Sequence, residues 1–285
     1  MTKSFTNCQL PENWKKVVQI CKKGDRLSPS QYRPISLTSV VCKCIEKIVA
    51  WDLTSFLMEF HSALLPIQDG FLPGRSVSAN LIKNLELWTR AQEEDYPVDV
   101  IYLDFEKAFD AVPFHRLIYK LEHFGVRGKL LSWIGEYVTG RSFQVRINGH
   151  LSESMDVVSG VPQGSVLGPL LFIIYVADIG QNMSCKSSPF ADDTKIFCDP
   201  TFQHGDMAQD LYELKRWTDD WLLRLNVNKC AILHIGYNDP HLPYFIDGSK
   251  LAVTEEQINL GVTIASNPKW ESHITKIVKR ANSTQ

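Results

Sequence analysis

Two adjacent carboxylates, Asp192 and Asp193, lie between apolar residues, with Phe190 and Ala191 before them and Ile196 and Phe197 shortly after them. A charge beside a buried strand is costly unless a partner or a cation compensates it. Successive residues of a strand point to opposite faces, whereas in a tight turn both can reach one cation. The pattern therefore predicts half of a metal site at the tip of a β-hairpin.

A third carboxylate, Asp104, closes the apolar run 98–103, which is rich in β-branched residues and typical of a buried strand. If the two strands share a sheet, the three acids repel one another and divalent cations would relieve that repulsion. Oxygen ligands favour Mg²⁺ or Mn²⁺ over zinc. Two such ions about 4 Å apart would serve phosphoryl transfer. The alternative is that the three acids are ordinary turn residues at the surface.

The net charge of −2 does not by itself indicate a nucleic-acid-binding protein, but the charges are unevenly distributed. Residues 11–47 contain eight basic and three acidic side chains, and the last stretch carries Lys269, Lys276, Lys279 and Arg280. Basic ends around an acidic centre suit a polyanion, although solvated surface charge is the simpler alternative.

Seven scattered cysteines and no signal peptide favour a reducing, intracellular setting. The cysteines have no zinc-ligand spacing. The longest apolar run, 166–177, is interrupted by Gly168 and Pro169 and falls short of the roughly 20 residues that span a bilayer. We therefore expect a buried helix there and no membrane partner.

Periodicity and turn signals predict an α+β domain, because helices and hairpins interrupt one another without strict βαβ alternation. Strands are expected at 98–103, 231–235 and 258–264, with one hairpin across Asn148-Gly149 and another at the paired acids. Residues 64–75 read as an irregular loop. Helices are expected over 37–58, 78–91, 127–139, 165–179, from near Pro113, and along Met207 to Trp221.

Three segments occur in the order found in reverse transcriptases. Asp104-Phe-Glu-Lys-Ala-Phe-Asp110 resembles motif A, Ser159-Gly-Val-Pro-Gln-Gly-Ser-Val-Leu-Gly-Pro169 resembles motif B, and Phe190-Ala-Asp-Asp193 resembles motif C. Three further blocks are similar to those of non-LTR, LINE-type retrotransposon polymerases of the jockey-like group: Tyr32-Arg-Pro-Ile-Ser-Leu37, Gln68-Asp-Gly-Phe71 with Gly74-Arg75-Ser76, and Leu260-Gly261. The resemblance extends from about Pro11 to about Ile274. Group II intron proteins and telomerase are related alternatives.

The resemblance implies a right-hand polymerase fold of fingers and palm, with an antiparallel sheet packed on helices. It places a fingers-type region at 1–97, the palm at 98–265 with a fingers contribution near 113–158, and the start of a truncated thumb at 266–285. It implies RNA-directed DNA synthesis with two Mg²⁺ ions, an RNA template, a DNA primer and dNTPs, in the nucleus or the cytoplasm.

The same resemblance assigns roles to individual residues. Metal binding falls to Asp104, Asp192, Asp193 and the backbone carbonyl of Phe105. Phe109 matches a steric gate that rejects the 2′-hydroxyl of rNTPs, a task for which steric exclusion suits better than an apolar pocket. The remaining matches are nucleotide contacts by Gln163, Gly164, Arg33 and, more weakly, Lys22, and a proton-donating Lys229.

Several of these positions also have simpler interpretations. Arg33 could form a surface ion pair, Phe109 could be a core residue, and Lys229 could be a plain surface lysine. Asp110 is expected to hold the turn before Pro113. His61, His115, His123 and His234 match no role and are expected to be structural. The resemblance leads us to expect a truncated copy without the endonuclease and thumb of full elements, so the alternative function is an inactive retroelement remnant that at most binds nucleic acid.

Overall fold

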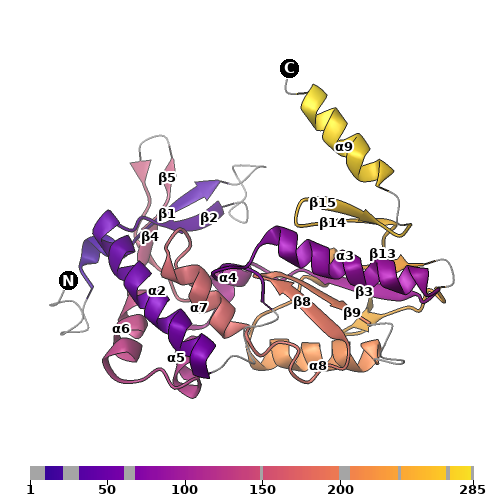
Figure 1. Cartoon of the computed structure of the whole chain (residues 1–285). Helices are drawn as coiled ribbons and strands as arrows, with labels where there is room; N and C mark the ends of the chain where they lie inside the picture. Colours follow the sequence, from indigo (N-terminus) through magenta and orange to yellow (C-terminus); the bar gives the residue numbers. More distant parts are fainter. Residues whose placement is uncertain are drawn as a thin grey trace. The chain divides into compact units, whose positions relative to one another are not determined.

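The computed structural model describes residues 10–21, 32–60, 68–147, 150–198, 206–236, 239–267 and 270–283. The chain forms two compact units whose segments alternate along the sequence, and Figure 1 shows their elements. Unit 1 comprises Met1–Pro66 and Lys107–Ala177, and unit 2 comprises Ile67–Glu106 and Asp178–Gln285. The sequence led us to expect consecutive parts, and the names fingers, palm and thumb remain predictions.

Unit 2 is built on a five-stranded sheet with the order β13-β10-β3-β9-β8. Its central strand, β3 (Val98–Leu103), is antiparallel to β9 (Asp193–Phe197) and to β10 (Ala231–Ile235). Strand β8 (Lys186–Phe190) extends the sheet as an antiparallel partner of β9, and β13 (Ala252–Val253) runs parallel to β10. The β8–β9 pair is the predicted hairpin with the paired acids at its tip.

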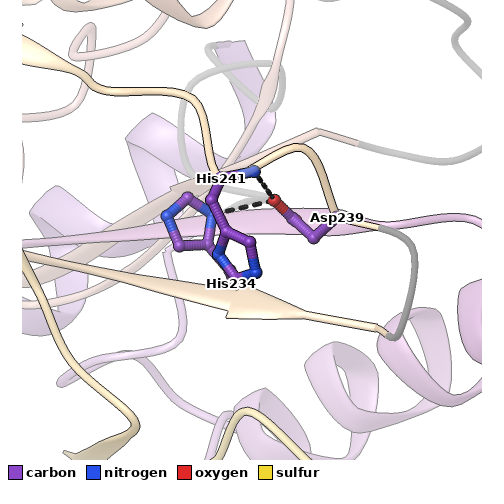
Figure 2. A group of neighbouring side chains, drawn as sticks. All are labelled: His234, Asp239 and His241. Carbon is purple, nitrogen blue, oxygen red and sulfur yellow. Dashed lines mark hydrogen bonds and ion pairs between the residues drawn. The ribbon is translucent and has the colours of Figure 1, made fainter.

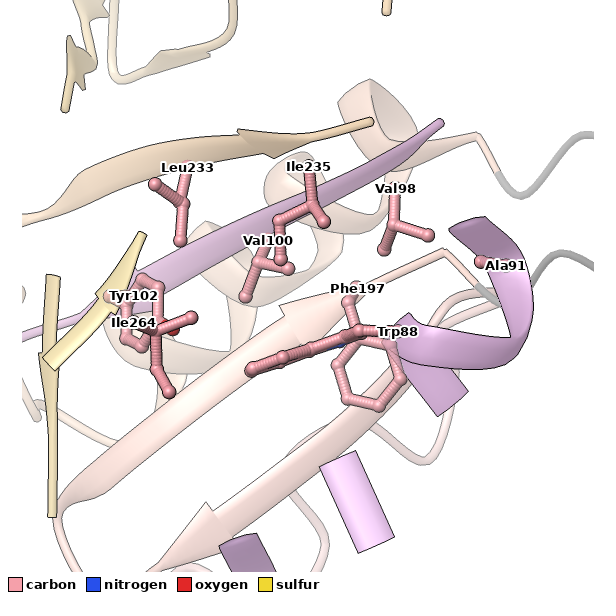
Figure 3. Packing of buried hydrophobic residues seen from close by; sticks show 9 residues of the cluster. All are labelled: Trp88, Ala91, Val98, Val100, Tyr102, Phe197, Leu233, Ile235 and Ile264. Carbon is pink, nitrogen blue, oxygen red and sulfur yellow. The ribbon is translucent and has the colours of Figure 1, made fainter. Parts of the chain in front are cut away.

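One face of this sheet packs against helix α3 (Val77–Glu93). Alternate residues of a strand share a face, so Val98, Val100 and Tyr102 of β3 all point toward the helix. They form a core cluster with Trp88 and Ala91 of α3, Phe197, Leu233, Ile235 and Ile264 (Figure 3). The Trp88 and Phe197 rings meet edge to face, with centroids 6.0 Å apart.

The opposite face of the sheet is covered by helix α8 (Met207–Asp220), which lies across the sheet from α3 in Figure 1. Ile101 and Leu103 of β3 point to this side and are buried. The smaller elements of unit 2 follow along the chain: η3 (Val227–Lys229), β11 (Phe245–Ile246), β12 (Ser249–Lys250), β14 (Glu256–Asn259), β15 (Val262–Ala265) and α9 (Glu271–Asn282).

Unit 1 combines helices with a four-stranded sheet of order β2-β1-β4-β7. The strands of this sheet are β1 (Lys16–Cys21), β2 (Tyr32–Ser36), β4 (Ser142–Gln144) and β7 (Met155–Asp156). A separate two-stranded sheet is formed by β5 (Arg146–Ile147) and β6 (His150–Leu151). Its helices are η1 (Glu12–Trp14), α2 (Val40–Phe60), α4 (Ala108–Ala111), α5 (Phe114–His123), α6 (Gly128–Val138) and α7 (Leu167–Tyr175).

The apolar helix α7 is anchored in unit 1 by a buried carboxylate. Glu46 of α2 is fully buried and accepts hydrogen bonds from the backbone N–H groups of Val166 and Leu167, at 2.5 and 3.0 Å. These donors lie at the N-terminus of α7, where unpaired N–H groups and the helix dipole favour a negative charge. The same carboxylate accepts a hydrogen bond from the Cys42 thiol, and the pKa of Cys42 rises to about 12, chiefly because the thiol is buried.

Most of the expected elements are present, and two differ in an instructive way. The strand expected at 258–264 is a hairpin of β14 and β15, because Leu260 and Gly261 both have positive φ and form a tight turn. The helix expected over 165–179 ends at Tyr175 and is followed by a turn in which Gly180 has φ +86°. The hairpin across Asn148-Gly149 pairs β5 with β6, while its two turn residues lie outside the described residues.

Candidate functional site: carboxylates at the strand ends

The strand register of unit 2 brings Asp104 and Asp193 together. Leu103 of β3 pairs with Thr194 of β9, so Asp104, the next residue, lies opposite Asp193 at the start of β9. Residues directly opposite in antiparallel strands have Cβ atoms about 4.5–5.5 Å apart. The pKa of Asp193 is raised, first because the surrounding protein removes part of its hydration and also because the Asp104 carboxylate is close. Two of the three predicted carboxylates, Asp104 and Asp193, therefore lie close together.

The third acid, Asp192, lies in the two-residue turn of the β8–β9 hairpin. Phe190 pairs with Asp193, which leaves Ala191 and Asp192 as the turn residues. Ala191 has φ +56°, a conformation that a side chain with a Cβ atom adopts at a cost. The turn therefore needs support from the rest of the unit.

That support comes from Gln68 and Gly70. The Gln68 side-chain oxygen Oε1 accepts hydrogen bonds from the backbone N–H groups of Ala191 and Gly70, both at 2.8 Å. A Cβ atom at Gly70 would lie 2.7 Å from the Ala191 nitrogen, so only glycine allows this close approach. The sequence had identified this block only through its resemblance, without a physical role for Gln68.

A buried lysine, Lys195, lies two residues after Asp193 on the same face of β9. Its Nζ is 3.0 Å from Oδ1 of both Asn80 and Asn259. Burial lowers the pKa of Lys195 to about 8, while Asp193 and Asp69 act in the opposite direction. Sequence reasoning missed this cation, although a lysine directly before the apolar pair Ile196-Phe197 was a visible signal.

The backbone around Asp104 is fixed by the segment that precedes β10. The Asn226 N–H donates to the Asp104 carbonyl at 2.8 Å, and the Glu106 N–H donates to the Arg224 carbonyl at 2.8 Å. These two bonds flank the antiparallel bridge between Phe105 and Leu225. In such a bridge Phe105 directs its own carbonyl away from Leu225. This carbonyl, a predicted metal ligand, is therefore not used in that pairing.

Lys229 lies beside the first carboxylate. Its Nζ is 3.6 Å from Oδ1 of Asp104, and its side chain is 66% exposed. The predicted proton donor is thus next to the carboxylate cluster and also accessible to solvent. An exposed ion pair of this kind stabilises a fold little, which leaves room for a chemical role.

The other predicted site residues belong to unit 1. The ring of Phe109 stacks on the buried ring of Phe172 in α7, with centroids 4.3 Å apart and an angle of 24° between the rings. This contact fixes the orientation of Phe109. Arg33 lies on β2 and is exposed, and no ion pair holds it within the described part of unit 1. Lys22 lies outside the described residues.

Gln163 and its neighbouring glycines make close contacts inside unit 1. The Gln163 side-chain amide donates to Oδ1 of Asp110 at 2.6 Å, which confirms that Asp110 forms a hydrogen bond at this turn. A Cβ atom at Gly160 would lie 2.7 Å from the Asp110 Cα atom. At Gly164, where φ is +83°, a Cβ atom would lie 3.0 Å from a side-chain atom of Ile35. Both glycines thus permit close packing around motif residues.

The donor set of Asp104, Asp192 and Asp193 fits a hard divalent cation. It offers carboxylate oxygens, and burial raises the pKa of Asp193, with a smaller contribution from the nearby Asp104 carboxylate. Mg²⁺ prefers such oxygen ligands. A separate group of potential ligands in unit 2, formed by His234, Asp239 and His241, was not expected from the sequence. In the described residues, no helix is long and apolar enough to cross a membrane.

The chain is similar in sequence to known reverse transcriptases. The family model described as reverse transcriptase (RNA-dependent DNA polymerase) matches residues 20–264. A probable RNA-directed DNA polymerase from transposon X-element of Drosophila melanogaster is 29% identical over 95% of this chain, which covers 31% of that protein. The RNA-directed DNA polymerase from mobile element jockey of Drosophila funebris is 28% identical over 92% of this chain and 30% of its own length. The chain thus spans about a third of these relatives.

Solved structures show the same fold at low sequence identity. Apo telomerase from Candida tropicalis, truncated from its C-terminal domain, superimposes with a TM-score of 0.59 and 11% identity, over 90% of this chain and 54% of the telomerase chain. A Candida tropicalis telomerase in complex with a fragment of telomeric RNA gives a TM-score of 0.61 at 10% identity, over 93% and 46% of the two chains. The α+β architecture described above is therefore of the polymerase type.

Proposed function

Because the chain belongs to the reverse transcriptase family, we propose that it is the catalytic part of an RNA-directed DNA polymerase of a non-LTR, jockey-like mobile element. It would add dNTPs to the 3′ end of a DNA primer paired with an RNA template. The observation that carries this proposal is the register of β3 and β9, which sets Asp104 opposite Asp193 next to the turn that holds Asp192.

In this reaction the primer 3′-hydroxyl oxygen attacks the α-phosphorus of the dNTP, its proton passes to solvent, and the bond from the α-phosphorus to pyrophosphate breaks. Asp104, Asp192, Asp193 and the Phe105 carbonyl would hold two Mg²⁺ ions, which Mn²⁺ could replace. When bound, these ions supply Lewis-acid activation of the hydroxyl and neutralise phosphate charge. The protein residues fix the carboxylates through the Gln68 contact and the Asn226 contact described above.

Lys229 would donate the proton that the leaving pyrophosphate gains, and solvent would then return a proton to the amine. Two properties support this assignment: the ammonium group lies 3.6 Å from an Asp104 oxygen, and its exposure gives it access to water. A cationic acid close to developing phosphate charge can contribute about 10²–10⁴-fold to the rate.

Recognition of the nucleotide would fall to residues of unit 1. The Phe109 ring, held by its stacking on Phe172, would exclude a 2′-hydroxyl. Gln163, oriented by Asp110, and the backbone at Gly164 would contact the nucleotide, and the exposed Arg33 would bind the triphosphate through its planar guanidinium. If Phe109 is the gate, Phe109→Val should lower the preference for dNTPs over rNTPs at least about tenfold.

Primer extension on a poly(rA)–oligo(dT) template with Mg²⁺ or Mn²⁺ tests the proposal. Asp193→Asn preserves shape and removes one charge, so we expect extension to fall by about 10²–10³-fold or more. The exposed Asp95→Asn variant of the same unit should extend like the parent chain. No dNTP incorporation by the parent at high protein concentration would refute an active enzyme and leave the inactive-remnant alternative.

A further inference from the structure

A second cluster of ligand-type side chains lies in unit 2 at the C-terminal end of β10. His234 comes from the strand, and Asp239 and His241 come from the segment that follows it (Figure 2). One potential ligand atom from each residue lies within 4.8 Å of the others. The two imidazole rings meet edge to face, with centroids 4.7 Å apart.

Two polar atoms in this cluster are buried and lack hydrogen-bond partners among the described residues: Nε2 of His234 and Oδ2 of Asp239. The two residues are only 3% and 8% exposed. Buried polar atoms are almost always paired with protein or water, so each exception calls for an explanation. Both unpaired atoms are of the kinds that bind transition metals.

The other nitrogen of His234 is already engaged. The register of β3 and β10 places His234 opposite Asp99, and Nδ1 is 2.5 Å from Oδ1 of Asp99 and 3.1 Å from Oδ1 of Asp239. The Tyr244 hydroxyl donates to the second oxygen of Asp99 at 2.6 Å. Asp99 therefore accepts the Nδ1 proton, and the lone pair of a neutral imidazole is left on Nε2. A carboxylate behind a histidine in this manner is the usual support of a metal-binding imidazole.

The charges also favour a cation. Asp99 and Asp239 both contribute carboxylates to this buried region, and His234 is the only basic side chain that pairs with either of them in the described parts of the chain. A bound divalent cation would compensate the negative charge of these carboxylates.

We propose that His234, Asp239 and His241 bind a divalent transition-metal ion of the zinc class. Two imidazole nitrogens and one carboxylate oxygen are ligands that suit Zn²⁺ and discriminate against Mg²⁺. Ligand atoms bound at about 2.0–2.2 Å in a tetrahedron lie about 3.3–3.6 Å apart, so binding requires the present separation of up to 4.8 Å to contract. His241 is exposed and outside regular structure, and its side chain can supply this movement.

The site is distinct from the carboxylate cluster described above. Asp99, which supports His234, lies on β3, and Asp104, five residues later, directly follows this strand; five residues correspond to about 16 Å along a strand. The metal would tie the segment after β10 to the sheet, and a water molecule would complete its coordination on the exposed side. Its role would be structural, separate from the proposed polymerase chemistry.

The test is metal binding by the untagged full chain, first treated with chelator and then held in excess Mg²⁺. Calorimetric titration with Zn²⁺ should show one saturable site with a Kd in the micromolar range or below, and Zn²⁺ should raise the Tm. Co²⁺ should give the visible absorption of a tetrahedral site with nitrogen and oxygen ligands. His241→Ala should weaken binding at least tenfold, while replacement of another exposed histidine, His115→Ala in unit 1, should leave binding like that of the parent.

Because His241 is exposed, its loss should leave the fold intact even if His234→Ala does not fold. Three results would overturn the proposal. The first is no saturable Zn²⁺ binding by the parent chain, and the second is equal affinity in His241→Ala. The third is a Co²⁺ spectrum dominated by thiolate charge transfer, which would assign the metal to the cysteines.

Discussion

The contact between Gln68 and the turn of the β8–β9 hairpin should be essential for the carboxylate cluster. Gln68→Leu keeps a side chain of similar size but removes Oε1, which accepts the N–H groups of Ala191 and Gly70 at 2.8 Å each. Ala191 and Gly70 are both buried, so water cannot readily replace the lost acceptor. The positive φ of Ala191, +56°, then has no hydrogen bond to maintain it.

The expected loss of stability follows from the two N–H groups that would lose their acceptor. Each buried N–H left without a partner costs about 1–3 kcal/mol, so the substitution should lower the free energy of unfolding by about 2–6 kcal/mol. The lower figure applies if the turn opens and lets water reach both amides. A loss of 2 kcal/mol corresponds to a fall in Tm of about 4–8 °C for a unit of this size. An opened turn would also displace Asp192 and Asp193.

The measurements are thermal unfolding and primer extension well below the Tm of the variant. A displacement of about 1 Å at reacting groups can cost about 10²-fold, so we expect kcat to fall at least tenfold while the chain remains folded. Gln209→Leu makes the same chemical change on the exposed face of α8 and should alter neither quantity. A Gln68→Leu protein with the parent Tm and the parent kcat would show that the turn does not depend on this contact.

Three further substitutions or treatments have definite expected results. Gly160→Ala should destabilise unit 1 by at least about 2 kcal/mol in urea unfolding, because φ is +99° and the new Cβ would lie 2.7 Å from the Asp110 Cα atom. The pKa of Lys195 is about 8 in the folded state, below its ordinary value of 10.5, so between these pH values the unfolded state binds more protons than the folded state. The free energy of unfolding should therefore rise with pH across this range by up to about 3 kcal/mol. This rise is measured relative to Lys195→Met, which lacks the titrating group. The Cys185 and Cys198 sulfur atoms are 3.2 Å apart, so diamide should form a disulfide between them, detectable as the loss of two thiols.

Each of these predictions has a matched comparison. Gly74→Ala, where φ is +74° and no atom lies within 4 Å of the added Cβ, should cost only the backbone strain. A parallel pH dependence in the parent and in Lys195→Met would contradict the lowered pKa. Persistence of the thiol loss in Cys198→Ser would assign the oxidation to other cysteines.

The strands that carry the acids could be predicted because their sequences are locally consistent. The run 98–103 and the run 231–235 are apolar and β-branched, and the structure contains strands at these bounds. The hairpin at Asp192 was predictable for the same reason, since Asp192 lies between two extended segments. Local pattern and global fold agree at these positions, as expected for a minimally frustrated chain.

The contacts that support the acids could not be predicted, because they join segments far apart in sequence. Gln68 contacts Ala191, and Lys195 contacts Asn259. These tertiary contacts cannot be predicted from the periodicity of the local sequence. His234 was expected to be a satisfied structural histidine, and its Nδ1 does pair with Asp99. Its buried Nε2, however, has no partner in the described residues, a fact visible only in three dimensions.

Two unfavourable features converge on the carboxylate hairpin, and they are best understood together. Ala191 adopts a left-handed conformation, and Lys195 retains a positive charge in a buried position, where its pKa falls to about 8. Strain of this type persists only where surrounding structure enforces it, and it concentrates at functional sites. The Gln68 hydrogen bond enforces the first and the two asparagine carbonyls enforce the second. An ordinary surface turn would need neither the Gln68 hydrogen bond nor a buried lysine held by two asparagines. Their presence therefore favours a chemical role for Asp193 over that of an ordinary turn residue.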